Sequence, residues 1–146
     1  MAPIELRDLT DADRDGAHRA ARASTSGWPR GDVDDRSAFD AWLADQDADP
    51  ATTVRAVVDG GTVVGIAAGF DTDGDREVAL ALVPGSGTDA ATDALRLLTA
   101  LEPERPLYAC VPTDDDPSHA MLASVGFVES RRTDDEIVYV LPPTLE

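Results

Sequence analysis

The sequence of 146 residues contains no lysine, one cysteine and few aromatic residues. Its basic residues, apart from two histidines, are 12 arginines against 29 aspartates and glutamates, so the formal net charge is -17. This charge repels nucleic acids and anionic membranes, and we expect neither as a partner. Because the acidic residues are spread over the whole chain, they predict a solvated surface suited to a salt-rich, halophilic cytoplasm; attraction of a cationic substrate is the alternative.

Long hydrophobic runs are also missing. No segment approaches the roughly 20 apolar residues needed to cross a bilayer, and the N-terminal stretch lacks the pattern of a signal peptide, so a cytoplasmic protein is expected. Cys110 can form no intrachain disulfide, and its apolar neighbours predict a small buried hydrophobe and not a nucleophile. The length and a hydrophobic content of 42% predict one domain over residues 1–146.

The apolar periodicity alternates between that of strands and that of helices. Strands are expected over residues 4–9, 52–58, 62–70, 76–83, 106–111 and 136–142, with a further short strand over 127–132. Helices are expected over 10–24, 35–46 and 117–125, and where Ala91, Ala94, Leu95, Leu98 and Leu101 form one face. Thr10 with Asp13 marks the first helix start, and the Asp-Gly pair at 59–60 marks a tight hairpin turn. This order predicts an α/β (α+β) fold: a mixed, mostly antiparallel central sheet of six or seven strands flanked by about four helices.

Three segments together are similar to one family. They are VRAVVDGGTVVGIAAGF (54–70), EVALALVPGSGTDAATDALRLLTALE (77–102) and LYACVPTDDDPSHAMLASVGFVESRR (107–132). Across nearly its whole length the chain resembles the GNAT superfamily of acetyl-CoA-dependent N-acetyltransferases. The acidic residue Glu77 and Leu122 near the Val-Gly-Phe motif resemble the branch that acetylates the N-termini of ribosomal proteins and related amines.

The resemblance implies acetyl-CoA as co-substrate and a phosphate-binding loop between the strand at 76–83 and the next helix. It implies cofactor contacts from Leu82, Val83, Gly85, Ser86, Gly87, Thr88, Asp89, Ala90, Ala91, Asp115 and Ser118. Of the family's loop pattern Q/R-x-x-G-x-G/A only Ala91 fits, and Asp89 replaces a glycine that lets the diphosphate approach the backbone. Two interpretations of Asp89 are open: a first-turn residue favoured by the helix dipole, or a carboxylate that repels the phosphates and weakens or abolishes binding.

Amine acetylation needs a base that removes a proton from the ammonium group and an acid that protonates the leaving thiolate. Glu77 is the expected base because it shares one face of its strand with Ala79 and Ala81; an exposed glutamate at a strand start is the alternative. Ser118 matches the serine that the family has near the thiol end of the cofactor, and it is the second catalytic candidate. Asp115 replaces the family's asparagine, so any contact that needs an amide donor is lost.

The remaining residues with reactive side chains give no further site. Leu122 occupies the position of the family's acid tyrosine, so the general acid is not identified. His18 and His119 have neither triad nor metal-ligand spacing and are expected to be surface or helix-end residues. The acidic stretches 71–75 and 113–118 lack the calcium-loop pattern with its terminal glutamate, so we predict solvated turns and no metal site.

These features predict an N-acetyltransferase that moves an acetyl group from acetyl-CoA to a primary amine by direct transfer. The alternative is a degenerate member of the same fold that binds a partner without catalysis. The expected acceptor is a small-molecule or peptide amine, and a homodimer is an open alternative to a monomer.

Overall fold

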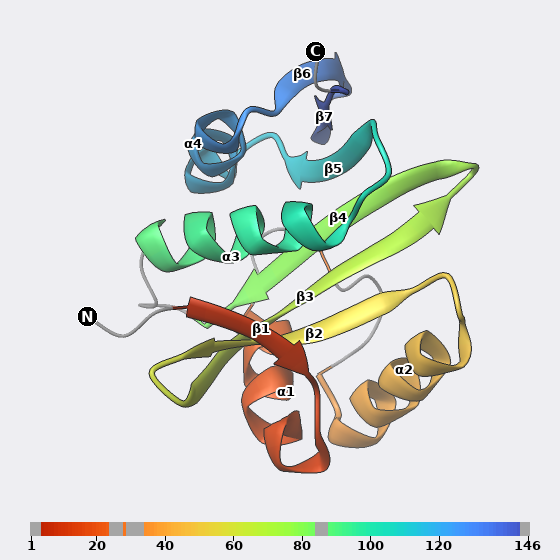
Figure 1. The fold of residues 1–146 in the computed structure, drawn as a ribbon, viewed down its shortest axis with the longest axis vertical. Coiled ribbons are helices and arrows are strands. Elements are labelled where there is room, and N and C mark those ends of the chain that lie inside the picture. The colour runs from red at the N-terminus through yellow and green to blue at the C-terminus, as the bar shows by residue number, and fades with distance from the viewer. Residues whose placement is uncertain (1–3, 24–27, 29–33, 84–87, 144–146) are drawn as a thin grey trace.

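The computed structural model describes residues 4–23, 28, 34–83 and 88–143. The strands are β1 (Ile4–Asp8), β2 (Thr53–Asp59), β3 (Thr62–Thr72), β4 (Asp75–Leu82), β5 (Leu107–Pro112), β6 (Val128–Arg132) and β7 (Glu136–Leu141). The helices are α1 (Arg14–Ala23), α2 (Arg36–Ala48), α3 (Thr88–Leu101) and α4 (Asp116–Val125), with a short 3₁₀ helix, η1 (Asp11–Asp13), before α1. The strands form one seven-stranded sheet in the order β1-β2-β3-β4-β5-β7-β6, with β4–β5 as the parallel pair (Figure 1). This confirms the predicted mixed, mostly antiparallel sheet with helices on both faces.

Two tight turns set the register of the β2-β3-β4 meander. Gly60 and Gly61 join β2 to β3 with φ angles of 59° and 87°, so the two positive angles fall one residue later than the predicted Asp-Gly pair at 59–60. The Asp-Gly pair that supplies such angles is Asp73–Gly74, between β3 and β4, with φ of 50° and 88°. Both are the two-residue connections whose twist matches that of antiparallel strands.

The helix start predicted at Thr10 is present, but as a 3₁₀ turn that leads into α1. The buried carboxylate of Asp13 accepts hydrogen bonds from the backbone N–H of Thr10 at 2.9 Å and from its hydroxyl group at 3.0 Å. Arg7 on β1 adds an ion pair at 3.0 Å. The backbone hydrogen bond from Thr10, helped by the Thr10 hydroxyl and the Arg7 charge, holds the pKa of Asp13 below its ordinary value against the opposing effect of burial.

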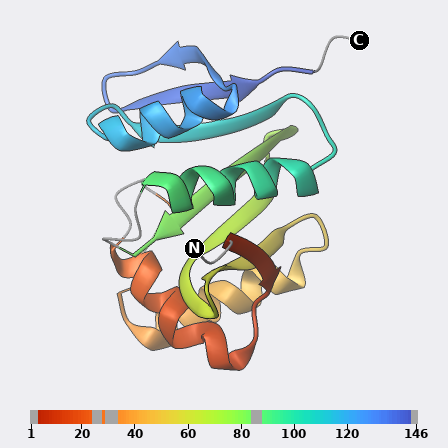
Figure 2. The ribbon, with the colours of Figure 1, turned by 60° about the vertical axis from the view of Figure 1, so that its left-hand side comes forward.

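The sheet separates two apolar cores. Between the sheet and the helices α3 and α4 lies a larger core, which includes Val78, Leu98 and Leu122. Under α1 and α2 lies a smaller one around Phe39 and Ile66 (Figure 2). Cys110 on β5 is half-buried, so the prediction of a fully buried residue was wrong. Among the described residues no helix combines the length and apolar character that a membrane crossing requires.

Candidate functional site

The parallel strands β4 and β5 separate along their length. They pair at two positions only, Arg76 with Leu107 and Glu77 with Tyr108, and both strands continue beyond these pairs without bonding to each other. α3 follows β4 and α4 follows β5, so both helices begin near the carboxyl ends of the separating strands (Figures 1 and 2). In α/β sheets ligands bind at the carboxyl ends of strands where neighbours diverge, and helix N-termini attract anions. This end of the sheet is the candidate functional site.

A buried ion pair lies at the end of the β4–β5 junction where the two strands are still hydrogen-bonded to each other. The Arg76 guanidinium donates from Nε to Glu102 Oε2 at 2.8 Å and from Nη2 to Oε1 at 3.0 Å, and the two side chains are 11% and 6% exposed. Arg76 also pairs with Asp71 at 3.2 Å and donates to the carbonyl oxygen of Ala51. A Cβ added at Gly69 would lie 2.0 Å from Glu102 Oε1, so a larger residue here requires the Glu102 side chain to shift. The sequence does not predict this pair, because its members are 26 residues apart and no local pattern links them.

Glu77 lies at the last β4–β5 pair before the strands separate. It is half-buried, and its Cα partners are Phe70 on β3 and Tyr108 on β5. By strand alternation it shares a face with Ala79 and Ala81, and Ala81 packs in the core under α1 and α2. The structure therefore places Glu77 on the α1–α2 side of the sheet, at the start of the opening; its role as a base stays a prediction.

The predicted cofactor loop is described only at its two ends. Gly85, Ser86 and Gly87 lie outside the described residues, as does the side chain of Thr88, the first residue of α3. At the strand end Leu82 closes β4, and the Val83 N–H donates to the Val64 carbonyl oxygen at 2.8 Å.

At the helix end of this loop, Asp89 is exposed in the first turn of α3, beside the buried Ala90 and the half-buried Ala91. The position of Asp89 agrees with the first-turn interpretation, because a carboxylate there is favoured by the helix dipole. Its effect on cofactor affinity stays a prediction.

Asp115 and Ser118 meet at the start of α4. Asp115, 8% exposed, is the N-cap residue: its carboxylate accepts from the Ser118 N–H at 3.4 Å and from the Ser118 hydroxyl group. A helix cap at this position needs only hydrogen-bond acceptors. An aspartate can therefore serve here in place of the asparagine of the GNAT proteins that the sequence resembles. The Ser118 hydroxyl group donates its proton to Asp115. Toward a ligand, the Ser118 oxygen can therefore act as a hydrogen-bond acceptor.

His119 lies in the first turn of α4 and is half-buried against Tyr139 on β7, so it is a helix-end residue, one of the two predicted placements. Its Nε2 lies 3.2 Å from the Thr113 carbonyl oxygen, which can only accept, so Nε2 carries the hydrogen. In the neutral ring Nδ1 then accepts from the Tyr139 hydroxyl group at 2.8 Å. Burial raises the pKa of Tyr139, and the charge of Glu129 adds to this. Leu122 is 2% exposed in the core, so its position offers no acid.

Comparison with known proteins identifies the fold. No protein-family model matches the sequence, and no curated protein matches it. An acetyltransferase from Thermus thermophilus superposes with a TM-score of 0.75 at 21% identity, over 98% of this chain and 100% of that one. A GNAT-family acetyltransferase from Bacillus anthracis gives 0.74 at 14% identity, over 97% and 96%. The Campylobacter jejuni N-acetyltransferase PseH, in complex with acetyl coenzyme A, gives 0.69 at 15% identity, over 97% and 99%. At these identities the similarity establishes the GNAT acetyltransferase fold.

Proposed function

We propose that this chain is an N-acetyltransferase that transfers the acetyl group of acetyl-CoA to a primary amine by direct attack. The observation that carries the proposal is the separation of β4 from β5 beyond Glu77 and Tyr108, with α3 and α4 beginning at its open end. The whole-length similarity to acetyltransferase structures supports it, and one of those proteins is in complex with acetyl coenzyme A.

The residues at the opening fit such a cofactor in part. Diverging strands leave backbone N–H and C=O groups that no longer pair across the gap, and buried groups of this kind need partners. The pantetheine arm of coenzyme A is an extended chain with amide groups, so it offers suitable partners. The first amides of α3 suit a diphosphate, and Asp89 beside them opposes it. Leu82 and Val83 would line the cofactor site on the side of β4. The helix cap formed by Asp115 and Ser118 would line it on the side of α4.

Glu77 would accept a proton from the acceptor's ammonium group, directly or through a water molecule. The freed amine nitrogen then forms a bond to the acetyl carbon while the carbon–sulfur bond breaks, and the departing thiolate takes up a proton. Leu122 cannot supply that proton, so the acid is a group other than the residue at the family's tyrosine position.

Several finer assignments belong to this proposal. Glu77 and Leu122 favour the branch that acetylates ribosomal-protein N-termini, with a peptide or a small amine as acceptor. We further propose that residues 1–146 act as one domain in a salt-rich cytoplasm, where screening makes a net charge of -17 tolerable.

The test is a screen of primary amines for coenzyme A release, in molar KCl, with the wild-type protein, Glu77→Gln and Glu104→Gln. Glu104 is an exposed glutamate outside the opening and serves as the matched control. We expect Glu77→Gln to lower turnover by about 100-fold or more with little change in acetyl-CoA affinity, as for loss of a general base. Unchanged turnover would remove Glu77 from the mechanism. Absence of acetyl-CoA binding in a calorimetric titration would overturn the proposed function and leave a non-catalytic binding module.

A further inference from the structure

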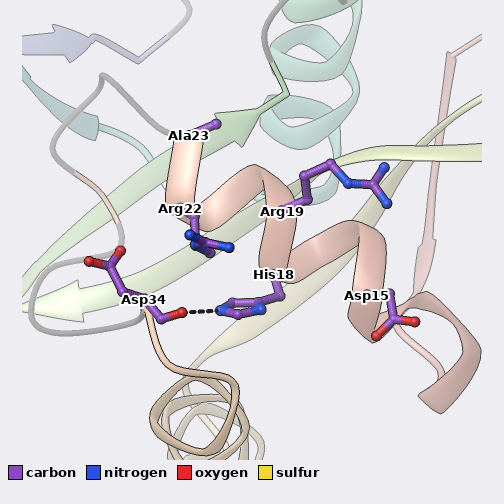
Figure 3. A pocket seen from close by; sticks show the side chains of 6 residues that line it. All are labelled: Asp15, His18, Arg19, Arg22, Ala23 and Asp34. Atoms are coloured by element: carbon purple, nitrogen blue, oxygen red, sulfur yellow. Dashed lines mark hydrogen bonds between the residues drawn. The ribbon is translucent and has the colours of Figure 1, made fainter.

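A pocket of about 440 Å³ lies on the outer side of the carboxyl-terminal half of α1 (Figure 3). It is lined by Asp15, His18, Arg19, Arg22, Ala23 and Asp34. The first five come from one helix, where spacings of three and four residues bring side chains to the same face. Asp34 comes from the segment that leads into α2, so the pocket lies between two elements that are distant in sequence.

Two arginines of this pocket are not engaged by a carboxylate. In the part of the chain that the structure describes, Arg7, Arg14 and Arg36 each pair with a carboxylate, whereas Arg19 and Arg22, like Arg96, Arg105 and Arg131, have no acidic partner within ion-pair distance. Both are exposed and three residues apart on α1. Guanidinium groups have five donors in a planar fork that matches carboxylate and phosphate oxygens, so two such groups at one pocket indicate a site for an anion.

The acids at the pocket form no ion pair with either arginine in the part of the chain that the structure describes. The Asp15 carboxylate pairs with the Arg36 guanidinium on α2. Asp34 accepts from His18 Nε2 through its backbone oxygen at 3.0 Å, and its carboxylate adds one negative charge. His18 is also fixed by its ring contact with Phe39, with centroids 5.0 Å apart. The six lining residues thus hold two arginines and two aspartates, and one of these carboxylates, that of Asp15, is engaged by Arg36, which also pairs with Asp40 at 3.1 Å.

The helix that lines the pocket lies on the same side of the sheet as Glu77. α1 packs on β3 and β4, with Ala17 and Ala21 in the same small core as Ala81. The carboxyl end of α1 lies beside the carboxyl end of β4 in both views of the fold (Figures 1 and 2). Glu77 lies on this same face of β4, as its alternation with Ala81 shows. The pocket at α1 and the proposed base near the start of β4 are therefore on the same side of the sheet.

We propose that this pocket binds an anionic group, a carboxylate or a phosphate, carried by the amine acceptor. That the bound molecule is an amine acceptor rests on the proposed function. The anion site itself is inferred from the pocket residues alone. It narrows the substrate class to amines that carry an acid, such as amino acids, acidic peptides or phosphorylated amines. It also gives an acidic protein a way to retain an anion that its overall charge repels.

The binding step can be measured without catalysis, because the chain has two histidines and only His18 lines the pocket. Inorganic phosphate is titrated at fixed pH and KCl while the imidazole signals are followed by NMR, with His18→Gln used for assignment and His119 as internal reference. We expect the His18 signal to shift saturably in the wild type and in Arg96→Ala, the matched control that removes an exposed arginine on α3. The shift should be lost in the double variant Arg19→Ala, Arg22→Ala. A His18 signal that does not move, or that moves equally in the double variant, would overturn the anion site.

The acceptor step compares amines with and without an acid: β-alanine with its amide, and phosphoethanolamine with ethanolamine. We expect coenzyme A release to favour the acid-bearing member of one pair by at least tenfold, the favoured pair distinguishing carboxylate from phosphate. The double variant should lose that preference through a raised KM, and Arg96→Ala should keep it. An equal preference in the double variant would overturn the acceptor assignment. Phosphate binding at His18 together with no release from any amine would overturn the proposed transfer and keep the anion site.

Discussion

The substitution Gly69→Ala tests whether the buried pair at the closed end of the β4–β5 junction holds the fold together. The new Cβ would lie 2.0 Å from Glu102 Oε1 and 2.7 Å from Glu102 Cδ, so the carboxylate has to move. Because Glu102 is 6% exposed and binds Arg76 through both oxygens, moving its carboxylate disturbs that pair. Breaking a buried pair costs about 3–5 kcal/mol. Arg76 keeps Asp71 at 3.2 Å, so we expect the lower end of that range, about 3 kcal/mol.

This loss corresponds to a fall in melting temperature of roughly 6–12 °C for a chain of this size. Denaturant unfolding in molar KCl measures it directly, with Gly61→Ala as control. Gly61 has nothing within 4 Å of an added Cβ but a φ of 87°, so its cost is limited to backbone strain, about 1–2 kcal/mol.

A double-mutant cycle separates the clash from other effects of the new methyl group. Once Glu102→Ala has removed the carboxylate, adding Gly69→Ala should cost less than about 1 kcal/mol more, since the atom it displaces is gone. Two outcomes would refute the reasoning: a Gly69→Ala variant within about 0.5 kcal/mol of the wild type, or full additivity of the two substitutions.

Three further predictions follow from charge. Asp13→Asn should lower the unfolding free energy at pH 7 by about 1–2 kcal/mol through loss of the Thr10 and Arg7 contacts. Because the folded-state pKa of Asp13 lies below its ordinary 3.8, this stabilisation is complete above that value and is lost as the pH falls below it; a difference between the two proteins that stays constant to pH 2 would contradict this. The melting temperature should rise with KCl from dilute buffer to molar salt because the net charge is -17, and a flat or falling curve would be evidence against a salt-adapted surface. Asp89→Gly should tighten acetyl-CoA binding by about 1 kcal/mol at low salt and less at high salt, and equal affinity in calorimetric titrations of both proteins would show that Asp89 does not oppose the cofactor.

Local signals in the sequence were sufficient for most of the secondary structure. The Thr10–Asp13 spacing marked the first helix start, and alternation of apolar residues located the strands. These signals act between neighbours in the chain, so they need no knowledge of the rest of the fold. Even the error in the first hairpin was small: the turn uses Gly60 and Gly61, because either pair of flexible residues can adopt the positive φ angles.

The candidate site could be predicted only where its parts are close in sequence. Asp115 and Ser118, three residues apart, were both predicted, and the geometry of a helix N-cap brings them together. Glu77 was identified as a strand residue with a distinct face, but its place at the last β4–β5 pair depends on how far two strands stay in register. Tyr139 was not foreseen as the partner of His119, because the two are 20 residues apart on different elements.

The sequence by itself determined approximately where the helices and strands lie, and it determined the overall charge, because these depend on composition or on contacts between chain neighbours; the mixed sheet was inferred from the order of the elements. Only the tertiary structure decided which distant groups meet. The order β5-β7-β6, the Arg76–Glu102 pair over Gly69 and the pocket that Asp34 lines together with α1 depend on how whole elements pack. Packing is decided by the sum of many side-chain contacts across the core, so no single short stretch of the chain encodes it.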